Sequence, residues 1–341
     1  MLPIDCNGKI QNSMKNEDQK LVTIGGGSGQ FALLSGLRDL YGIKITAVVS
    51  MADSGGSTGR LRDELGILPP GDVLKCILAL SPHRDIARII FLKRFIQDRR
   101  LQGHNAGNML LTILSQYTGS FPTGVQALSE ILDAKGTILP VTTDRATLVA
   151  ELTGGRHIYG ETAIDIPRGT QREKIRKVFL VPHHSDSISV YPPVIEAINS
   201  ADYIIIGPGD LFTSIISNLI VPGVKEALQE TSAKILYIIN IMTKFGETHN
   251  FSGIDFVRKL EECIGRQVDG IIYNAEKPDT KLLAQYVEQK AEFVEINERD
   301  DCWENRKIYV SNMLDIAGSI VRHDSKKLAS LVQKIISQNR E

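Results

Sequence analysis

Short apolar runs alternate with amphipathic segments along most of the chain, and this alternation limits the fold more than any other feature. Residues 203–206 read Tyr-Ile-Ile-Ile, and a strand that is apolar at every position suits a sheet covered on both faces. In the intervening segments apolar residues recur at spacings of three and four, which is typical of helices. The pattern predicts an α/β protein with a doubly wound, mostly parallel sheet.

The predicted elements form one main domain with a distinct middle region. We expect residues 1–19 to be a polar, mobile lead-in and residues 20–338 to form a single α/β domain. Short strands separated by turns predict an inserted or edge β region over about 136–190. Asp72 follows a Pro-Pro-Gly turn and is expected to cap the next helix. The expected strands are 20–24, 44–51, 202–207, 234–242, 268–275, 293–296 and 307–312, and the expected helices are 30–40, 72–81, 85–97, 108–119, 211–220, 254–264, 281–290 and 326–338.

The composition is that of an ordinary globular protein. The 341 residues are 42% hydrophobic and 23% charged, with a net charge of -1, so the overall balance does not indicate nucleic acid or an anionic membrane as a partner. No run approaches the roughly 18 apolar residues of a membrane helix, so we expect no membrane insertion. The four cysteines are widely separated, which favours a cytoplasmic location over a disulfide framework or a metal knuckle; they are Cys6, Cys76, Cys263 and Cys302.

A glycine-rich loop follows the first predicted strand. Small residues let the backbone approach a phosphate, and the helix that follows offers free N–H groups. The spacing Gly27-x-Gly29-x-x-Ala32 fits a loose dinucleotide-binding fingerprint, although a plain strand-to-helix turn fits equally well. The candidate ligand-binding residues in this loop are Gly25, Gly26, Gly27, Ser28 and Gly29.

The loop after the second predicted strand, 52–66, suits phosphate better than nicotinamide. Its glycines permit a close backbone approach, its hydroxyls can donate to phosphate oxygens, and its arginines can pair with phosphate bidentately. Asp53 stands where an NAD site places its ribose-binding carboxylate. Two such loops after consecutive strands favour a diphosphate ligand over a solvated surface loop. The candidate ligand-binding residues are Asp53, Gly55, Gly56, Ser57, Thr58 and Arg60.

Three later loops add polar candidates. In 103–108 the amides of Asn105 and Asn108 can read a base or a sugar hydroxyl, while Asn105 can equally be a simple helix cap. The loop 207–214 starts another helix suited to an anion, and Asp210 there either caps that helix or holds a cation that bridges to phosphate. The candidates of this loop and of 240–250 are Gly207, Gly209, Asp210, Ser214, Asn240 and Thr243.

Together these loops resemble those of the gluconeogenesis-factor (YvcK-like) family, which belongs to the CofD-like superfamily with 2-phospho-L-lactate transferase. The resemblance spans residues 21 to about 332. It is carried by "GGGSGQFALLSGLR", "ADSGGSTGRLRDELGILPPGD", "HNAGNMLLTIL", "GPGDLFTSIISNLIVPG", "NIMTKFGET" and "VRHDSKKLA".

The resemblance implies a CofD-like Rossmann variant and a cytoplasmic protein that binds the nucleotide sugar UDP-N-acetylglucosamine. It also implies links to carbon-source adaptation, cell shape and peptidoglycan precursor supply. By position the ligand would lie across 25–29, 53–60 and 207–214. Tyr286 and Arg322 resemble two further ligand contacts of the family, and an aromatic ring and an arginine suit such a ligand.

The chain departs from the family pattern at several of these positions. Ser54 replaces the second of two adjacent aspartates, which argues against a two-carboxylate magnesium site. Asp210 stands where the family more often has Ser, and Phe212 where it has Tyr. Lys244 and Phe245 replace a Gln-Pro pair.

Three functions remain open from the residues. The first is a nucleotide-sugar-binding regulator without turnover. The second is a transferase of the phospholactate type that uses a guanosine diphosphate conjugate and Mg²⁺, with Asp53 as candidate catalytic residue and Asp53 and Asp210 as candidate metal ligands. The third, an NAD-dependent oxidoreductase, ranks last because of the second loop. Ser325 is a candidate phosphorylation site, and a homo-oligomer is compatible with the sequence.

Overall fold

The structure is a computed structural model that describes residues 18–97, 100–167, 169, 171–183, 185–297, 303, 306–315 and 320–338. The predicted lead-in over 1–19 therefore lies almost entirely outside the described residues, as do Cys6, His184 and Cys302.

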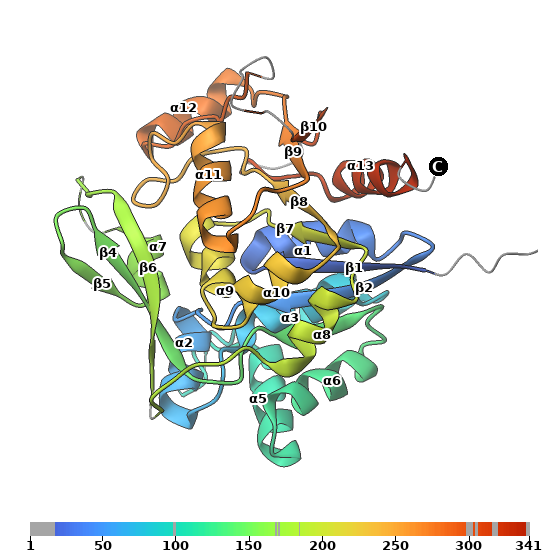
Figure 1. Ribbon diagram of the computed structural model, residues 1–341. Helices are drawn as coiled ribbons and strands as arrows, with labels where there is room; N and C mark the ends of the chain where they lie inside the picture. Colours follow the sequence, from blue (N-terminus) through green and yellow to red (C-terminus); the bar gives the residue numbers. More distant parts are fainter. Residues whose placement is uncertain are drawn as a thin grey trace, which may run out of the picture.

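The core of the molecule is a parallel sheet of seven strands in the order β10-β9-β8-β7-β1-β2-β3 (Figure 1). Every neighbouring pair in this sheet is parallel, which confirms the predicted doubly wound α/β fold. The strand order reverses between β1 and β7, and ligands of such sheets bind beyond the strand ends at this reversal. The strands are β1 (Gln19–Gly25), β2 (Ile43–Val49), β3 (Thr137–Pro140), β7 (Tyr203–Ile206), β8 (Lys234–Ile238), β9 (Gly270–Asn274) and β10 (Lys307–Ser311).

Helices cover both faces of this sheet. Helices α8, α10 and α11 lie along the near side in Figure 1, while α1 and α3 lie on the opposite side, where α13 also packs against α1. The central strand β7 is consequently buried at every position, as its all-apolar sequence predicts. The helices are α1 (Gly27–Leu37), α2 (Gly56–Leu65), α3 (Pro70–Leu80), α4 (Arg84–Phe91), α5 (Ala106–Thr118), α6 (Phe121–Ile131), α7 (Glu161–Asp165), α8 (Pro192–Asn199), α9 (Ser217–Leu219), α10 (Val224–Glu230), α11 (Gly253–Ile264), α12 (Thr280–Glu288) and α13 (Ser325–Gln338), with a π-helix η1 (Leu211–Ile216) before α9.

The region predicted as an inserted or edge β region contains an edge strand of the main sheet and a separate inserted sheet. Its first strand, β3, is the edge of the main sheet beside β2. The next three strands form a separate antiparallel sheet in the order β5-β4-β6, which projects at the left of Figure 1. These strands are β4 (Ala146–Leu152), β5 (His157–Tyr159) and β6 (Ile175–Pro182), and α7 follows β5.

Three local expectations were wrong, and a fourth, a helix over 211–220, is confirmed with a different helix type at its start. Residues 293–296 form no strand, because only Phe293 makes a bridge, to Met242. The helix expected over 85–97 ends at Phe91, and the residues after it pair with the 103–105 turn. Asp72 lies inside the first turn of α3 rather than at its cap. The helix expected over 211–220 begins as a π-helix.

In the part of the chain that the structure describes, no single helix is long and apolar enough to cross a membrane. One pair, Leu211–Leu219 with Val224–Glu230, reaches the length only together and bends by 74°.

Candidate functional site

A cavity of about 650 Å³ lies where the strand order reverses. Loops that follow β1, β7 and β8 form its walls, and residues from α7, α12 and the segment before α13 complete them. Eleven of the residues predicted from the sequence line it: Gly26, Gly27, Ser28, Gly29, Gly209, Asp210, Ser214, Asn240, Thr243, Tyr286 and Arg322. Tertiary structure thus brings together residues that lie almost 300 positions apart, from Gly26 to Arg322.

The wall after β1 is the start of α1, held in place by a carboxylate from another helix. The backbone N–H of Gly27 donates to Asp72 Oδ2 at 2.8 Å, so this N–H is not free for a ligand. Gly27 has a φ of +65°, a conformation that glycine adopts without strain. Gln30, one turn further, donates from Nε2 to the Val48 carbonyl at 3.0 Å and fixes α1 to the neighbouring strand. The Gln30 N–H donates to the Gly26 carbonyl at 3.5 Å, so the N–H groups of Ser28 and Gly29 are the ones in this turn left to consider for a ligand.

The loop after β7 packs directly against this wall. A Cβ on Gly29 would lie 2.2 Å from the Pro208 carbonyl oxygen, so only glycine permits this approach. Asn218 donates from Nδ2 to the Gly25 carbonyl at 3.1 Å and to the Ser214 carbonyl at 2.8 Å. The two loops that flank the reversal are therefore one rigid unit.

The residues from the loop after β8 have structural partners as well as cavity exposure. Asn240 Oδ1 accepts from the Gly209 N–H at 3.1 Å, and thereby holds the 207–210 turn. Thr243 Oγ1 accepts from the Glu292 N–H at 2.8 Å. Both side chains line the cavity and also position its walls.

Tyr286 and Arg322 form the wall opposite the sheet. The Tyr286 hydroxyl accepts a hydrogen bond from the Val321 N–H at 2.9 Å. The Tyr286 side chain on α12 is thus hydrogen-bonded to the backbone next to Arg322. Arg322 is exposed and lines the cavity. A residue with an aromatic ring and one with a guanidinium consequently line the same cavity as the glycine-rich start of α1.

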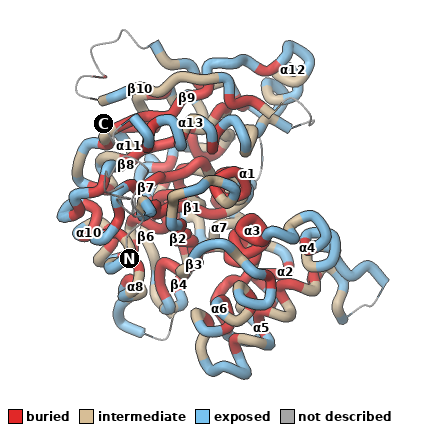
Figure 2. Tube along the Cα trace, turned by 90° about the vertical axis from the view of Figure 1, so that its right-hand side faces the viewer, coloured by how far each residue is buried: buried red, intermediate tan, exposed pale blue. Residues whose placement is uncertain are grey.

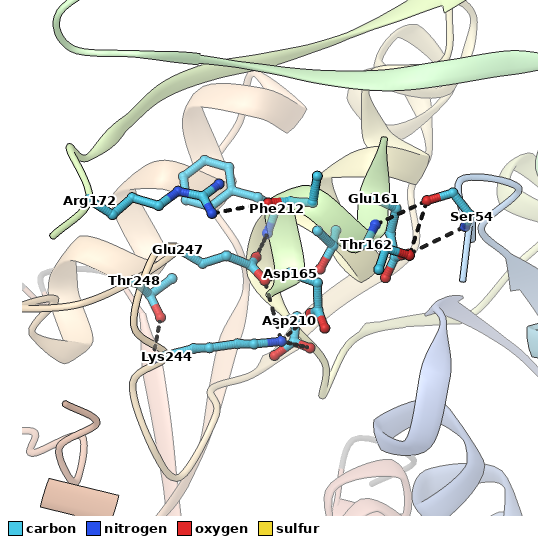
Figure 3. A network of polar contacts seen from close by, with 12 residues as sticks. Ser54, Glu161, Thr162, Asp165, Arg172, Asp210, Phe212, Lys244, Glu247 and Thr248 are labelled. Atoms are coloured by element: carbon cyan, nitrogen blue, oxygen red, sulfur yellow. Dashed lines mark hydrogen bonds and ion pairs between the residues drawn. The ribbon is translucent and has the colours of Figure 1, made fainter. Parts of the chain in front are cut away.

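An ammonium surrounded by three carboxylates closes one end of the cavity. Figure 3 shows the Lys244 side chain extended toward Asp165 and Asp210. Its Nζ lies 2.8 Å from Asp210 Oδ2, 3.5 Å from Glu247 Oε1, and in direct contact with Asp165 Oδ1. Asp210 makes no side-chain cap to the helix after it. Of the two roles predicted for Asp210, the structure shows neither a cap nor a free metal ligand but an ion pair.

Burial and neighbouring charges shift the pKa values of the side chains in this cluster. Burial alone would lower the pKa of Lys244, but Asp210, Glu247 and Asp165 outweigh it and raise that pKa. Burial raises the pKa of Asp210 despite the opposing effect of the ammonium. Burial, followed by the charge of Asp210, raises the pKa of Glu247 to about 8. The ammonium is therefore firmly charged, while the fully buried Glu247 carboxyl is largely protonated near neutral pH.

Magnesium, which the transferase reading requires, does not fit this cluster. Oxygens of Asp165, Asp210 and Glu247 all lie within 4.8 Å of one another, a spacing that could suit a metal ion. The Lys244 ammonium, however, already lies against all three carboxylates. A divalent ion would have to displace this tethered cation, so the cluster as it stands is not a magnesium site.

The second predicted loop lies outside the lining of this cavity, and its polar side chains bind other parts of the protein. Ser57 Oγ lies 2.9 Å from His104 Nδ1, and Asn108 donates from Nδ2 to the same hydroxyl at 3.3 Å. Arg60 donates to the Gln102 carbonyl at 2.6 Å. Asn105 accepts from the Asn108 N–H at 2.7 Å as the N-cap of α5, the simpler of its two predicted roles. Also outside the lining are Gly25, Asp53, Gly55, Gly56, Thr58 and Gly207, so the ligand contacts predicted for this whole group stay predictions.

Asp53 instead belongs to a second group of carboxylates behind the first wall. Burial, followed by the charge of Asp72, raises the pKa of Asp53. Asp72 in turn pairs with Lys75 at 2.9 Å and holds Gly27. Burial, then Asp53 and Asp165, raise the pKa of Glu161 to about 7.

Several residues that line the cavity or hold its walls were not predicted as site residues. Lys244 appeared only as a departure from the family pattern, and Asp165, Glu247 and Asp72 were not singled out for the site. A lone carboxylate in a helix or loop has no local pattern that reveals a distant partner. The sequence did contain one indication of this pair. Asp210 and Lys244 both depart from the family pattern, and in the structure they form an ion pair.

Comparison with known proteins identifies the family of this chain. Residues 21–334 match the family described as 2-phospho-L-lactate transferase CofD. A Thermotoga maritima protein is 38% identical over 321 residues, which covers 93% of this chain and 99% of that protein. The gluconeogenesis factor of Bacillus subtilis is 36% identical, which covers 94% of this chain and 98% of that protein. A crystal structure of a Bacillus halodurans protein superposes with a TM-score of 0.86 at 34% identity, and covers 93% of this chain and 100% of that one. The chain therefore belongs to the CofD family and, within it, to the gluconeogenesis factors.

Proposed function

We propose that this gluconeogenesis factor is a regulatory protein that binds UDP-N-acetylglucosamine in the cytoplasm, and that it links carbon metabolism to cell shape and cell-wall precursor supply. One observation carries the proposal. Tyr286 and Arg322 line the same cavity as two anion-suited loops, at the sheet's reversal point. Its volume of about 650 Å³ falls within the range of roughly 300–1,000 Å³ typical of ligand pockets.

The two ends of the cavity suit the two halves of a nucleotide sugar. The diphosphate would lie at the start of α1, where backbone N–H groups and the helix dipole favour an anion, with Arg322 as its counter-charge. The Tyr286 ring would contact the flat or apolar face of the ligand. Asp210 and Lys244 would accept from and donate to sugar hydroxyls at the opposite end.

The cavity lining supports binding without turnover. Among the residues that the structure describes, the hydroxyl groups of the lining are those of Ser28, Ser214, Thr243 and Tyr286, and none of them hydrogen-bonds to a basic side chain. A nucleophile needs such a base within hydrogen-bond reach. The Lys244 ammonium, which also lies in the lining, is held by carboxylates.

A transferase of the phospholactate type is the second candidate, favoured by the neighbouring carboxylates Asp53 and Asp72 behind the first wall. A close pair of carboxylates is a common ligand set for Mg²⁺ with phosphates. In this alternative the ligand would be a guanosine diphosphate conjugate, and Asp53→Asn would abolish its magnesium-dependent binding.

Thermal unfolding with a small ligand panel distinguishes these functions. A ligand at about 100 times its Kd adds roughly 2.7 kcal/mol of stability. We expect UDP-N-acetylglucosamine to raise Tm equally with Mg²⁺ and with EDTA. Arg322→Ala should weaken binding about 10- to 100-fold, because it removes a charge-assisted hydrogen bond.

The matched control is Lys326→Ala, since Lys326 is an exposed cation four residues away that does not line the cavity. It should leave the Tm shift unchanged. If only guanosine nucleotides with Mg²⁺ raise Tm, the transferase replaces the regulator. A shift with NAD alone would exclude both.

A further inference from the structure

The outward side of helix α4 is apolar, where a helix on a protein surface is normally polar. Ile86, Ile89 and Ile90 are 61%, 70% and 55% exposed, and their spacing of three and four places them on one stripe. The inward side is held by Ala87, which is 3% exposed. Helix α4 therefore exposes an apolar stripe, beside a charged side formed by Arg84, Asp85 and Arg88.

The chain after α4 extends the same surface. Phe95 and Ile96 are exposed, Ile96 by 75%. The segment is fixed rather than dangling, because the Phe95 backbone exchanges hydrogen bonds with Gly103 and His104 at 2.9 Å. Exposed isoleucines are ordinary when they are isolated, but a contiguous group marks an interaction surface. We call Ile86, Ile89, Ile90, Phe95 and Ile96 the α4 surface.

Basic side chains surround the α4 surface. Four occur between positions 84 and 96, against one acidic residue, Asp85: they are Arg84, Arg88, Lys93 and Arg94. Three of them have local partners: Arg84 pairs with Asp85 at 3.4 Å, the Arg88 guanidinium lies 4.9 Å above the Phe31 ring, and Arg94 donates to the Gly103 carbonyl at 2.5 Å. Figure 2 shows this helix as exposed along its outer side. The overall charge of -1 conceals this local excess of positive charge.

The exposed apolar side chains and the basic side chains together indicate which kind of partner the α4 surface binds. A second copy joined about a two-fold axis would place the same basic side chains against one another. A bilayer with anionic lipids instead pairs with the basic rim while the isoleucines enter the boundary between headgroups and acyl chains. We infer that the α4 surface docks the protein on an anionic membrane surface, without any segment crossing the membrane.

Co-sedimentation of the full-length protein with lipid vesicles tests this inference. We expect the protein to sediment with mixed phosphatidylglycerol–phosphatidylcholine vesicles and not with pure phosphatidylcholine vesicles, and binding should decrease as salt increases. Ile89→Glu should reduce the bound fraction about fivefold or more, since it removes apolar contact and adds a negative charge. Lys93→Glu provides a second variant that changes only the rim.

Matched controls come from other exposed positions. Ile131 at the end of α6 is 63% exposed, so Ile131→Glu changes a comparable side chain outside the α4 surface and should sediment like wild type. Thermal unfolding should show unchanged Tm for these variants, because all three side chains are exposed.

Three results would overturn the inference. They are absence of binding to the anionic vesicles, equal binding to neutral vesicles, and equal loss of binding in Ile131→Glu. Light scattering adds a fourth: a wild-type dimer that Ile89→Glu converts to monomers would assign the α4 surface to self-association instead.

Discussion

At the scale of single residues, Gly29 packs so closely against the Pro208 carbonyl that a Cβ would not fit between them. We predict that Gly29→Ala lowers stability by about 1–3 kcal/mol, because its Cβ would meet a backbone atom that cannot rotate away. Ligand affinity should fall as well, since both loops line the cavity. Chemical denaturation and ligand titration measure the two effects.

The control for this variant is Gly25→Ala in the same loop. A Cβ on Gly25 would lie 3.6 Å from the nearest atom, which is an ordinary contact. Equal stability of the two variants would contradict the close-approach argument.

Lys244 is the second residue with a specific expectation. Lys244→Gln leaves Asp165 and Asp210 without their cation, so we predict a loss of about 1–3 kcal/mol, a value reduced from that of fully buried pairs because these side chains are partly exposed. Added Mg²⁺ or Ca²⁺ should then raise the Tm of Lys244→Gln but not that of wild type, because the carboxylates lie within reach of one ion. Wild-type stabilisation by the same ions would show that the ammonium does not exclude them.

At the scale of elements, the start of α13 connects stability to the cavity. Asp324 Oδ1 accepts from the N–H groups of Lys326 and Lys327 at 2.9 Å each, and Asp324 lies two residues after Arg322. We predict that Asp324→Ala lowers stability by about 1 kcal/mol through loss of the cap, and weakens the proposed ligand because the Arg322 segment loosens. Denaturation and calorimetric titration give the two numbers.

The comparison is Ser252→Ala at the start of α11, which also removes an N-terminal hydrogen-bonding partner but lies outside the cavity lining. It should lower stability with little effect on affinity. If both variants weaken binding equally, α13 has no special connection to the site.

At the scale of the whole molecule, Glu161 joins the small sheet to the main one. It lies in α7, and its Oε2 accepts from the Ser54 N–H of the second loop at 3.3 Å. Burial raises its pKa from 4.5 to about 7, so the folded state retains a proton there that the unfolded state releases. The contribution of Glu161 to stability is therefore present below about pH 4.5 and is lost as pH rises toward 7.

Glu161→Gln should remove this dependence. We predict that the variant is more stable than wild type at pH 8 by about 1–3 kcal/mol, with the difference shrinking as pH falls to 5. Urea denaturation across this pH range measures it. A constant difference at all pH values would mean that Glu161 does not titrate in this window.

The sequence predicted which loops form the site better than it predicted the charge interactions within the site. Loops that follow apolar strands at a reversal of strand order must gather at one edge, so Gly26 to Gly29 and Gly209 to Ser214 could be placed together from pattern alone. The loop at 52–66 has the same composition, yet Ser57 and Arg60 bind the 102–104 turn. Composition cannot distinguish these outcomes, because hydroxyl and guanidinium groups bind protein carbonyls and imidazoles as readily as phosphates.

By itself, the sequence determined the layered α/β architecture, the family and the strand ends that carry the glycine-rich turns. Local hydrophobic periodicity and turn chemistry are sufficient for these features. Only the tertiary structure decided that Asp72 holds the first loop, that Lys244 lies among three carboxylates, and that α4 leaves isoleucines in solvent. Each depends on contacts or exposure set by distant parts of the chain, and a linear pattern does not contain those distances.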